Sequence, residues 1–121
     1  MSVRSVAAKF VELCRAGKNF DVMRTMYAPT MVSVERDGKE TVGQEAVIKK
    51  SADWASKLEF NGQTVAGPFF NGQSADQFAV YITQDVTPKS TGQRVMKEEV
   101  AVYTVKNDLI TREQFFYEGE H

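Results

Sequence analysis

Histidine and cysteine are almost missing from this sequence of 121 residues, in which His121 is the only histidine and Cys14 the only cysteine. A single cysteine excludes a disulfide within the chain. Zinc sites, histidine-based catalytic triads and cysteine–histidine nucleophiles need more of these side chains than the sequence offers. We therefore expect no metal and no cofactor. Any chemistry is expected to come from carboxylates, hydroxyls and aromatic rings.

The sequence also lacks an excess of charge of one sign. Fifteen basic residues face sixteen acidic ones, and no block of like charge occurs. A nucleic-acid partner would require a basic stripe, so none is expected. Long apolar runs are absent too, because Arg4, Lys9 and Glu12 interrupt the first apolar stretch, residues 3–14. We expect neither an export signal nor a membrane span, hence no membrane partner and a cytoplasmic location.

The first half of the chain has the periodicity of helices. Apolar residues recur at steps of three and four over residues 3–14, which predicts an amphipathic helix. A second, short helix is predicted from Asn19 until shortly before Pro29, because the residue before a proline disfavours helical geometry. A strand is predicted over residues 31–36, and a third helix from about 44 to 58.

In the second half the periodicity of the apolar residues changes to two. Strands are predicted over residues 60–70, 78–87, 95–105 and 109–117. Helices followed by a series of strands predict an α+β fold, in which helices cover one face of a curved antiparallel sheet. Such an arrangement leaves a cone whose wide end can hold a small ligand. The length fits one domain over residues 1–121.

Several short motifs resemble one known superfamily. They are FVELCRAG at residues 10–17, followed by Tyr27-Ala28, then VGQEAV at residues 42–47, and the final hairpin over residues 103–117. Together they resemble the nuclear-transport-factor-2-like superfamily, in particular its SnoaL-like and ketosteroid-isomerase-like members. The resemblance implies a cystatin-like α+β fold, a cone-shaped curved antiparallel sheet wrapped around three N-terminal helices.

The resemblance also indicates which acid–base chemistry to expect. In the steroid isomerases a general base stands eight residues after the Tyr-Ala pair, and here that position is Glu35. Their oxyanion-donating tyrosine corresponds to Phe10, and their second donor to Ala101 or Val100, none of which can donate. Without these donors an enolising isomerase would lose several kcal/mol of transition-state stabilisation, so steroid isomerisation is not expected. SnoaL-like cyclase chemistry with a single carboxylate stays open.

The candidate site therefore consists of Glu35 as the catalytic carboxylate and a set of ligand contacts. In the alternative interpretation Glu35 faces water. The resemblance points one face of each of the last two strands toward the cavity. Several carboxylates in one pocket would raise at least one pKa, whereas the alternative pairs Glu99 and Glu113 with basic neighbours on a solvated face. The candidate ligand contacts are Phe10, Tyr27, Trp54, Glu99, Tyr103, Glu113, Phe115 and Tyr117.

Two functions from different classes follow from this site. The first is conversion of a small hydrophobic, polyketide-like molecule by lyase, isomerase or cyclase chemistry, with Glu35 as the base. The second is a non-catalytic ligand-binding or assembly domain of the same fold. A homodimer through the outer sheet face is expected as well, because the last strands carry apolar residues on both faces and the helices cover one.

Overall fold

A computed structural model describes residues 2–118, apart from the side chain of Ser74. His121 lies outside these residues. The described elements, in chain order, are α1 (Val3–Arg15), α2 (Asn19–Met26), β1 (Tyr27–Val34), β2 (Glu40–Val42), α3 (Gln44–Ser56), β3 (Leu58–Asn71), β4 (Ser74–Pro88), β5 (Val95–Lys106) and β6 (Leu109–Phe116).

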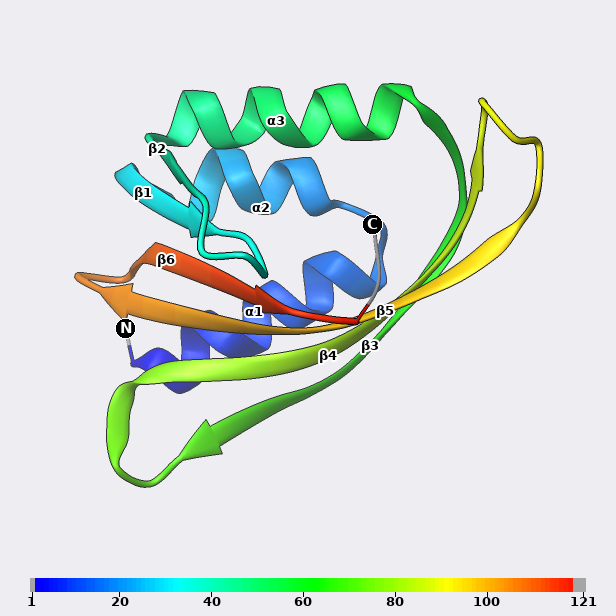
Figure 1. Ribbon diagram of the computed structural model, residues 1–121. Coiled ribbons are helices and arrows are strands. Elements are labelled where there is room, and N and C mark those ends of the chain that lie inside the picture. The colour runs from blue at the N-terminus through cyan, green and yellow to red at the C-terminus, as the bar shows by residue number, and fades with distance from the viewer. Residues whose placement is uncertain (1, 119–121) are drawn as a thin grey trace.

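The strands form one strongly curved sheet in the order β2-β1-β6-β5-β4-β3. The long strands β3, β4 and β5 bend around the helices, which lie on the concave side (Figure 1). This confirms the predicted α+β fold of a cone-shaped sheet around three helices. One detail differs from the prediction, since β1 and β6 are parallel and the sheet is mixed. The pattern of apolar residues does not reveal the relative direction of two strands so far apart in the chain.

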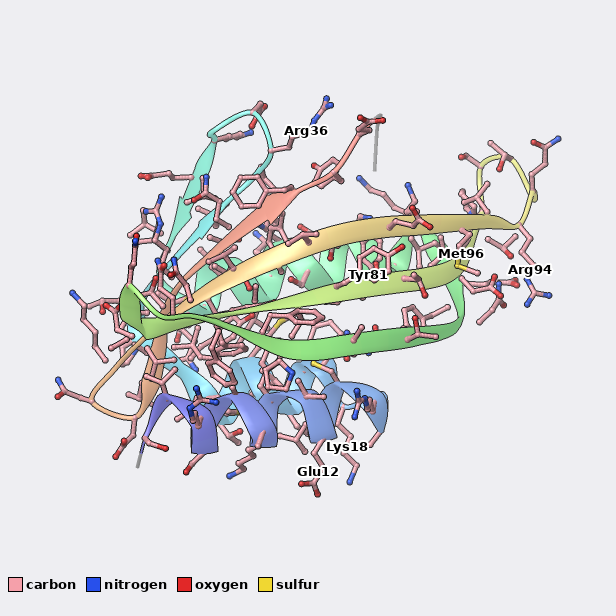
Figure 2. The ribbon with its side chains drawn as sticks, turned by 90° about the horizontal axis from the view of Figure 1, so that it is seen from below. Glu12, Lys18, Arg36, Tyr81, Arg94 and Met96 are labelled. Carbon is pink, nitrogen blue, oxygen red and sulfur yellow. The ribbon has the colours of Figure 1, made fainter. Side chains whose placement is uncertain are left out.

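Helix α1 forms where the periodicity predicts it, and its ends explain why. The side chain of Ser2 accepts a hydrogen bond from the backbone N–H of Ser5 at 3.1 Å, a typical N-cap. At the other end Gly17 adopts φ +75°, a left-handed conformation that favours glycine. Glu12 and Lys18 extend away from the sheet (Figure 2). The buried face consists of Val6, Ala7, Phe10, Val11 and Cys14.

The core lies between the helices and the concave face of the sheet. At its centre three aromatic rings meet, from α1, β4 and β5. The ring of Tyr103 lies 4.5 Å from that of Phe10 and 5.1 Å from that of Phe78, measured between centroids. Phe10 and Phe78 themselves meet edge to face at 5.4 Å. Burial of these rings supplies a large share of the apolar area removed from water.

Several element boundaries differ from the predicted ones, and one strand was not predicted. Strand β1 begins at Tyr27 rather than at residue 31, because Pro29 ends the helix but is compatible with extended backbone. The pairing of β1 with β6 is irregular between Tyr27 and Val32, which accommodates the missing N–H of the proline. Helix α3 ends at Ser56 and not at Leu58, which is buried and starts β3. The three-residue strand β2 was not predicted, since it is too short to show a period.

Within residues 2–118, no helix combines the length and the apolar character that crossing a membrane would require.

Candidate functional site

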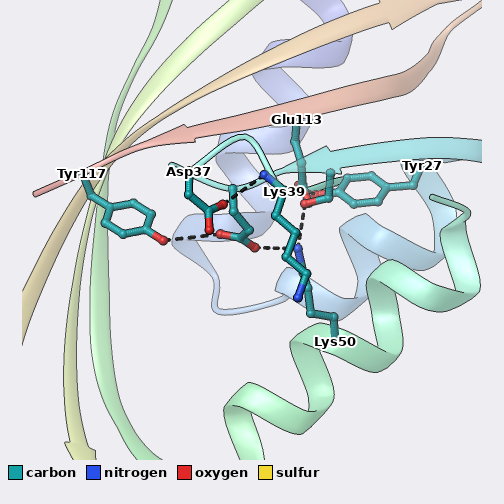
Figure 3. Close-up of polar contacts among 8 residues, drawn as sticks. Tyr27, Asp37, Lys39, Lys50, Glu113 and Tyr117 are labelled. Atoms are coloured by element: carbon teal, nitrogen blue, oxygen red, sulfur yellow. Dashed lines mark hydrogen bonds and ion pairs between the residues drawn. The ribbon is translucent and has the colours of Figure 1, made fainter. Parts of the chain in front are cut away.

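The candidate site lies where the end of β1 meets α3 and the end of β6 (Figure 3). Glu35 directly follows β1, and its side chain is 30% exposed. Lys50 on α3 donates from Nζ to Glu35 Oε1 at 2.7 Å and to Ser33 Oγ at 2.9 Å. The alternative in which Glu35 simply faces water therefore does not describe this carboxylate. It is a half-buried partner of an ion pair between a strand and a helix.

Glu113 on β6 is a buried carboxyl behind this ion pair, with an exposed fraction of 3%. The hydroxyl of Tyr27 donates to Glu113 Oε1, and Ser33 also hydrogen-bonds the carboxyl. Burial raises the pKa of Glu113, while the hydrogen bonds of Tyr27 and Ser33 act in the opposite direction. A buried carboxyl with these partners can stay in the interior without leaving a polar atom unsatisfied.

Tyr117, one residue beyond β6, closes the other side of the site. Its hydroxyl donates to Glu35 Oε2 at 3.5 Å, at the long end of hydrogen bonding. The guanidinium of Arg36 lies over the Tyr117 ring, 5.5 Å from the centroid. Burial, followed by the charge of Glu35, raises the pKa of the Tyr117 hydroxyl, so this group stays protonated and can orient a ligand as a donor.

Glu99 on β5 is the third carboxylate near Glu35. Burial, followed by the charges of Glu113 and Glu35, raises its pKa from the ordinary 4.5 to about 7, against the opposing effect of Lys50 and Lys97. A carboxyl with a pKa near neutrality can both hold and release a proton at working pH, which is the property of a general acid or base. The site therefore combines an ion-paired carboxylate with a carboxyl that exchanges protons near pH 7.

This raised pKa predicts how the stability of the fold depends on pH. The folded state binds the proton of Glu99 more tightly than the unfolded state does, so this stabilisation is complete below pH 4.5 and is lost as the pH rises through about 7. We expect the free energy of unfolding, from urea titrations, to fall across this window. In Glu99→Gln the free energy of unfolding will fall less steeply with pH. It will still fall, because the raised pKa of Glu113 contributes a decline in the same direction. Glu59→Gln, at an exposed position, will leave the decline as it is.

The structure brings some of the predicted site residues together and separates others. Glu35, Glu99, Glu113 and Tyr117 form one electrostatically connected group, and Tyr27 joins it from the buried side. Phe10 and Tyr103 lie in the aromatic core, Phe115 packs against that core, and Trp54 is half-buried on α3. Whether any of them touches a ligand stays a prediction. The alternative in which Glu113 lies on a solvated face is wrong, because its side chain is buried. Arg112, one of the basic partners expected in that alternative, pairs with Glu40 at 3.8 Å.

Two residues of the site were not singled out from the sequence, Lys50 and Ser33. The strand alternation does place Ser33 on the same face as Glu35, so a signal for it existed. Lys50 stands beside Lys49 in a helix with many polar positions, and its sequence neighbours do not distinguish it from a surface lysine. Only the packing of α3 against β1 shows that it reaches Glu35.

Two open grooves lie near the site, and Glu35 lines neither of them. One, of about 400 Å³, lies on the outer face of the sheet near the end of β6, where Tyr81, Val100 and Phe116 line it together with Glu99 and Tyr117. The other, of about 510 Å³, runs along α3 and is lined by Lys50 and Trp54. Because Glu35 is hydrogen-bonded both to Tyr117 and to Lys50, its carboxylate lies between a residue of each groove. A small molecule in the groove along α3 would contact Lys50, the ion-pair partner of Glu35.

Two observations concern the side chains that could bind a metal or act as a thiol nucleophile. Over residues 2–118, no three His, Cys, Asp or Glu residues are grouped so that they could hold a metal ion. Cys14 is buried in the core, and burial raises the pKa of its thiol to about 12. A thiol in this environment is not a nucleophile.

Comparison with known proteins identifies the family. The SnoaL-like domain model matches residues 1–117, whereas none of the curated proteins matches the chain significantly. A crystal structure from Mesorhizobium loti, described as a candidate SnoaL-like polyketide cyclase and also labelled a carbohydrate phosphatase, is 40% identical. The match covers 97% of this chain and 100% of that one, with a TM-score of 0.89.

More distant structures share the fold alone. A candidate SnoaL-like polyketide cyclase from Jannaschia sp. CCS1 is 16% identical, with a TM-score of 0.75 over 96% of this chain and 85% of that one. A protein of ketosteroid-isomerase-like fold from Catenulispora acidiphila, in complex with trimethylamine, is also 16% identical, with a TM-score of 0.73 over 93% and 85%. The family match over residues 1–117 and the 40% identical relative lead to one conclusion: the chain belongs to the SnoaL-like family.

Proposed function

We propose that this SnoaL-like protein binds a small, mainly apolar carbonyl compound beside Glu35 and moves a proton on it, with Glu35 as the general base. The observation that carries the proposal is the half-buried Glu35 carboxylate, held between Lys50 and Tyr117, with Lys50 lining the groove along α3. A positioned carboxylate of this kind supports proton abstraction next to a carbonyl group. The cyclase description of the 40% identical relative agrees with such chemistry.

Within this proposal the other carboxyl groups have different tasks. Glu99, with a pKa of about 7, returns a proton to the product or takes one from it. Glu113 is nearly inaccessible, and we assign it to positioning Ser33 and Tyr27 rather than to contact with a ligand. The reaction class is then an isomerisation or ring closure that begins with an enolate and needs no cofactor.

The test is hydrogen–deuterium exchange on carbonyl compounds. The protein is incubated in D₂O with bicyclic aromatic ketones and 1,3-diketones, and loss of the α-hydrogen signal is followed by NMR. We expect exchange with at least one of these compounds to exceed the buffer rate. Compounds that raise the melting temperature without exchanging would favour the non-catalytic ligand-binding alternative. The absence of both exchange and binding across the panel contradicts the proposal.

We also propose that two copies associate through the outer face of the sheet. Tyr81, Val100 and Phe116 lie side by side in register on three neighbouring strands and are 37%, 40% and 48% exposed. A contiguous apolar row of this kind on a sheet favours association with a second protein surface. The symmetric use of one patch by two copies is the simplest solution.

Sedimentation at micromolar concentration tests the association. We expect a dimer for the unchanged protein and a monomer for Val100→Asp, which puts a charge in the centre of the row. Ala8→Glu, at an exposed position of α1, is the matched control and will stay dimeric. A monomer for the unchanged protein contradicts the proposal.

A further inference from the structure

Lys50 has a hydrogen-bonding capacity that its observed partners do not exhaust. An ammonium group has three N–H donors. Within the described part of the chain, Lys50 Nζ has two acceptors, Glu35 Oε1 at 2.7 Å and Ser33 Oγ at 2.9 Å. Its side chain is 32% exposed and lines the groove along α3, where Trp54 offers an apolar surface. One donor of a positioned cation is therefore left for a molecule in that groove.

An enolate needs such a donor, and the usual positions do not supply it. Removing a proton beside a carbonyl group places negative charge on the carbonyl oxygen, and stabilising that charge is a major part of catalysis. Phe10 and Ala101, the positions that the family resemblance associates with donors, carry no polar side-chain atom and lie buried in the core. Lys50 on α3 is an alternative source, because its ammonium group contacts Glu35.

The short distance between the Lys50 ammonium and the Glu35 carboxylate fits a substrate in which the proton to be removed lies next to a carbonyl group. In an H–C–C=O group the hydrogen and the oxygen are close neighbours. A hydrogen-bond acceptor and a donor that already contact each other can therefore contact the hydrogen and the oxygen of such a group at the same time. The Glu35 carboxylate and the Lys50 ammonium are such a pair, at 2.7 Å, with Lys50 on α3 and Glu35 directly after β1. A carbonyl group that inserts between them would exchange the ion pair for two new contacts.

We propose that Lys50 is a second catalytic residue, which donates to the carbonyl oxygen of the substrate while Glu35 removes the neighbouring proton. This inference rests on the proposed function. The C–H bond breaks and its proton goes to Glu35. The electron pair forms the C=C bond, and the carbonyl π pair moves to the oxygen, which accepts a hydrogen bond from Lys50. Transfer of the proton from Glu35 to carbon completes an isomerisation. In a ring closure the enolate carbon instead attacks a second carbonyl carbon, whose π pair moves to its oxygen, and that oxygen takes the proton held by Glu35, so neither branch needs a co-reactant.

A merely structural role would make Lys50 a partner of Glu35 and nothing more. The two roles differ in what happens when Glu35 loses its charge. In Glu35→Gln, which imitates the protonated base, Lys50 no longer has a carboxylate partner and should bind an anionic oxygen more tightly. A purely structural lysine would bring no such gain.

The experiment uses 4-nitrophenol, whose anion imitates an enolate and is recognised by its absorbance. We expect Glu35→Gln to bind the anion about tenfold or more tightly than the unchanged protein, since a charge-assisted hydrogen bond replaces a repulsion. Adding Lys50→Met to that variant should remove the gain, while adding Lys9→Met, at an exposed lysine of α1 outside both grooves, should keep it. Lys50→Arg should retain part of it, because the cation remains.

Each outcome decides one of the two proposals. Equal binding of the anion with and without Lys50, or no binding by Glu35→Gln, overturns the role of Lys50 and leaves the base role of Glu35 to the exchange experiment. Binding that depends on Lys50 in a protein that catalyses no exchange supports the donor site and contradicts the proposed function. A melting curve for each variant ensures that all of them are folded when binding is measured.

Discussion

Glu35→Gln is expected to lower the rate of α-proton exchange by about 10²- to 10⁴-fold, the usual contribution of a positioned general base. The substitution keeps the size and shape of the side chain but removes the group that accepts the proton. The amide oxygen can still accept from Lys50, so the surroundings of the site stay in place. The measurement is the initial exchange rate by NMR, on the compound that the unchanged protein exchanges fastest.

Two controls make this result specific to Glu35. Glu45→Gln changes an exposed carboxylate in the first turn of α3 and should leave the exchange rate unchanged. The free energy of unfolding should change by less than about 1 kcal/mol in Glu35→Gln, because a partly exposed ion pair contributes little to stability. Exchange that survives Glu35→Gln and disappears in Glu99→Gln would contradict the assignment and make Glu99 the base.

The fold could be predicted from the sequence because its signals are local. The steps of three and four in α1 and the alternation in β4, β5 and β6 each depend on neighbouring residues along the chain. The parallel direction of β1 relative to β6 does not depend on sequence neighbours. It follows from the path of the chain through the long strands between them. Strand β2 forms because it pairs with the end of β1, and three residues carry too little pattern to indicate it.

The candidate site could be predicted only in part, for a similar reason. Glu35 was found through its spacing from Tyr27 and its resemblance to a known base position. The burial of Glu113 and the reach of Lys50 are consequences of packing between elements far apart in the chain. The strand alternation predicted carboxylates on one side of the sheet, whereas Lys50, the cation that pairs with Glu35, comes from a helix whose charges resemble those of any solvated face.

Phe78→Ala is expected to lower the free energy of unfolding by about 3–5 kcal/mol, the range for removing a buried phenylalanine. The ring is 1% exposed and contacts both other members of the aromatic core, Phe10 and Tyr103. Its loss leaves a cavity between a helix and two strands, where a rigid sheet limits collapse. Since a domain of this kind is stable by about 5–15 kcal/mol, the variant would lose a large fraction of its stability.

The effect should extend from the core toward the site. Tyr103, which stacks on Phe78, also hydrogen-bonds Tyr27, and Tyr27 donates to Glu113. A cavity beside Tyr103 frees that ring to move, so we expect the binding of 4-nitrophenol to weaken even where the variant is fully folded. Phe60→Ala, at a ring that is 46% exposed, is the matched control and should cost less than about 1 kcal/mol. Urea unfolding of both variants measures the difference, and equal losses would mean that the aromatic core does not hold the sheet on the helices.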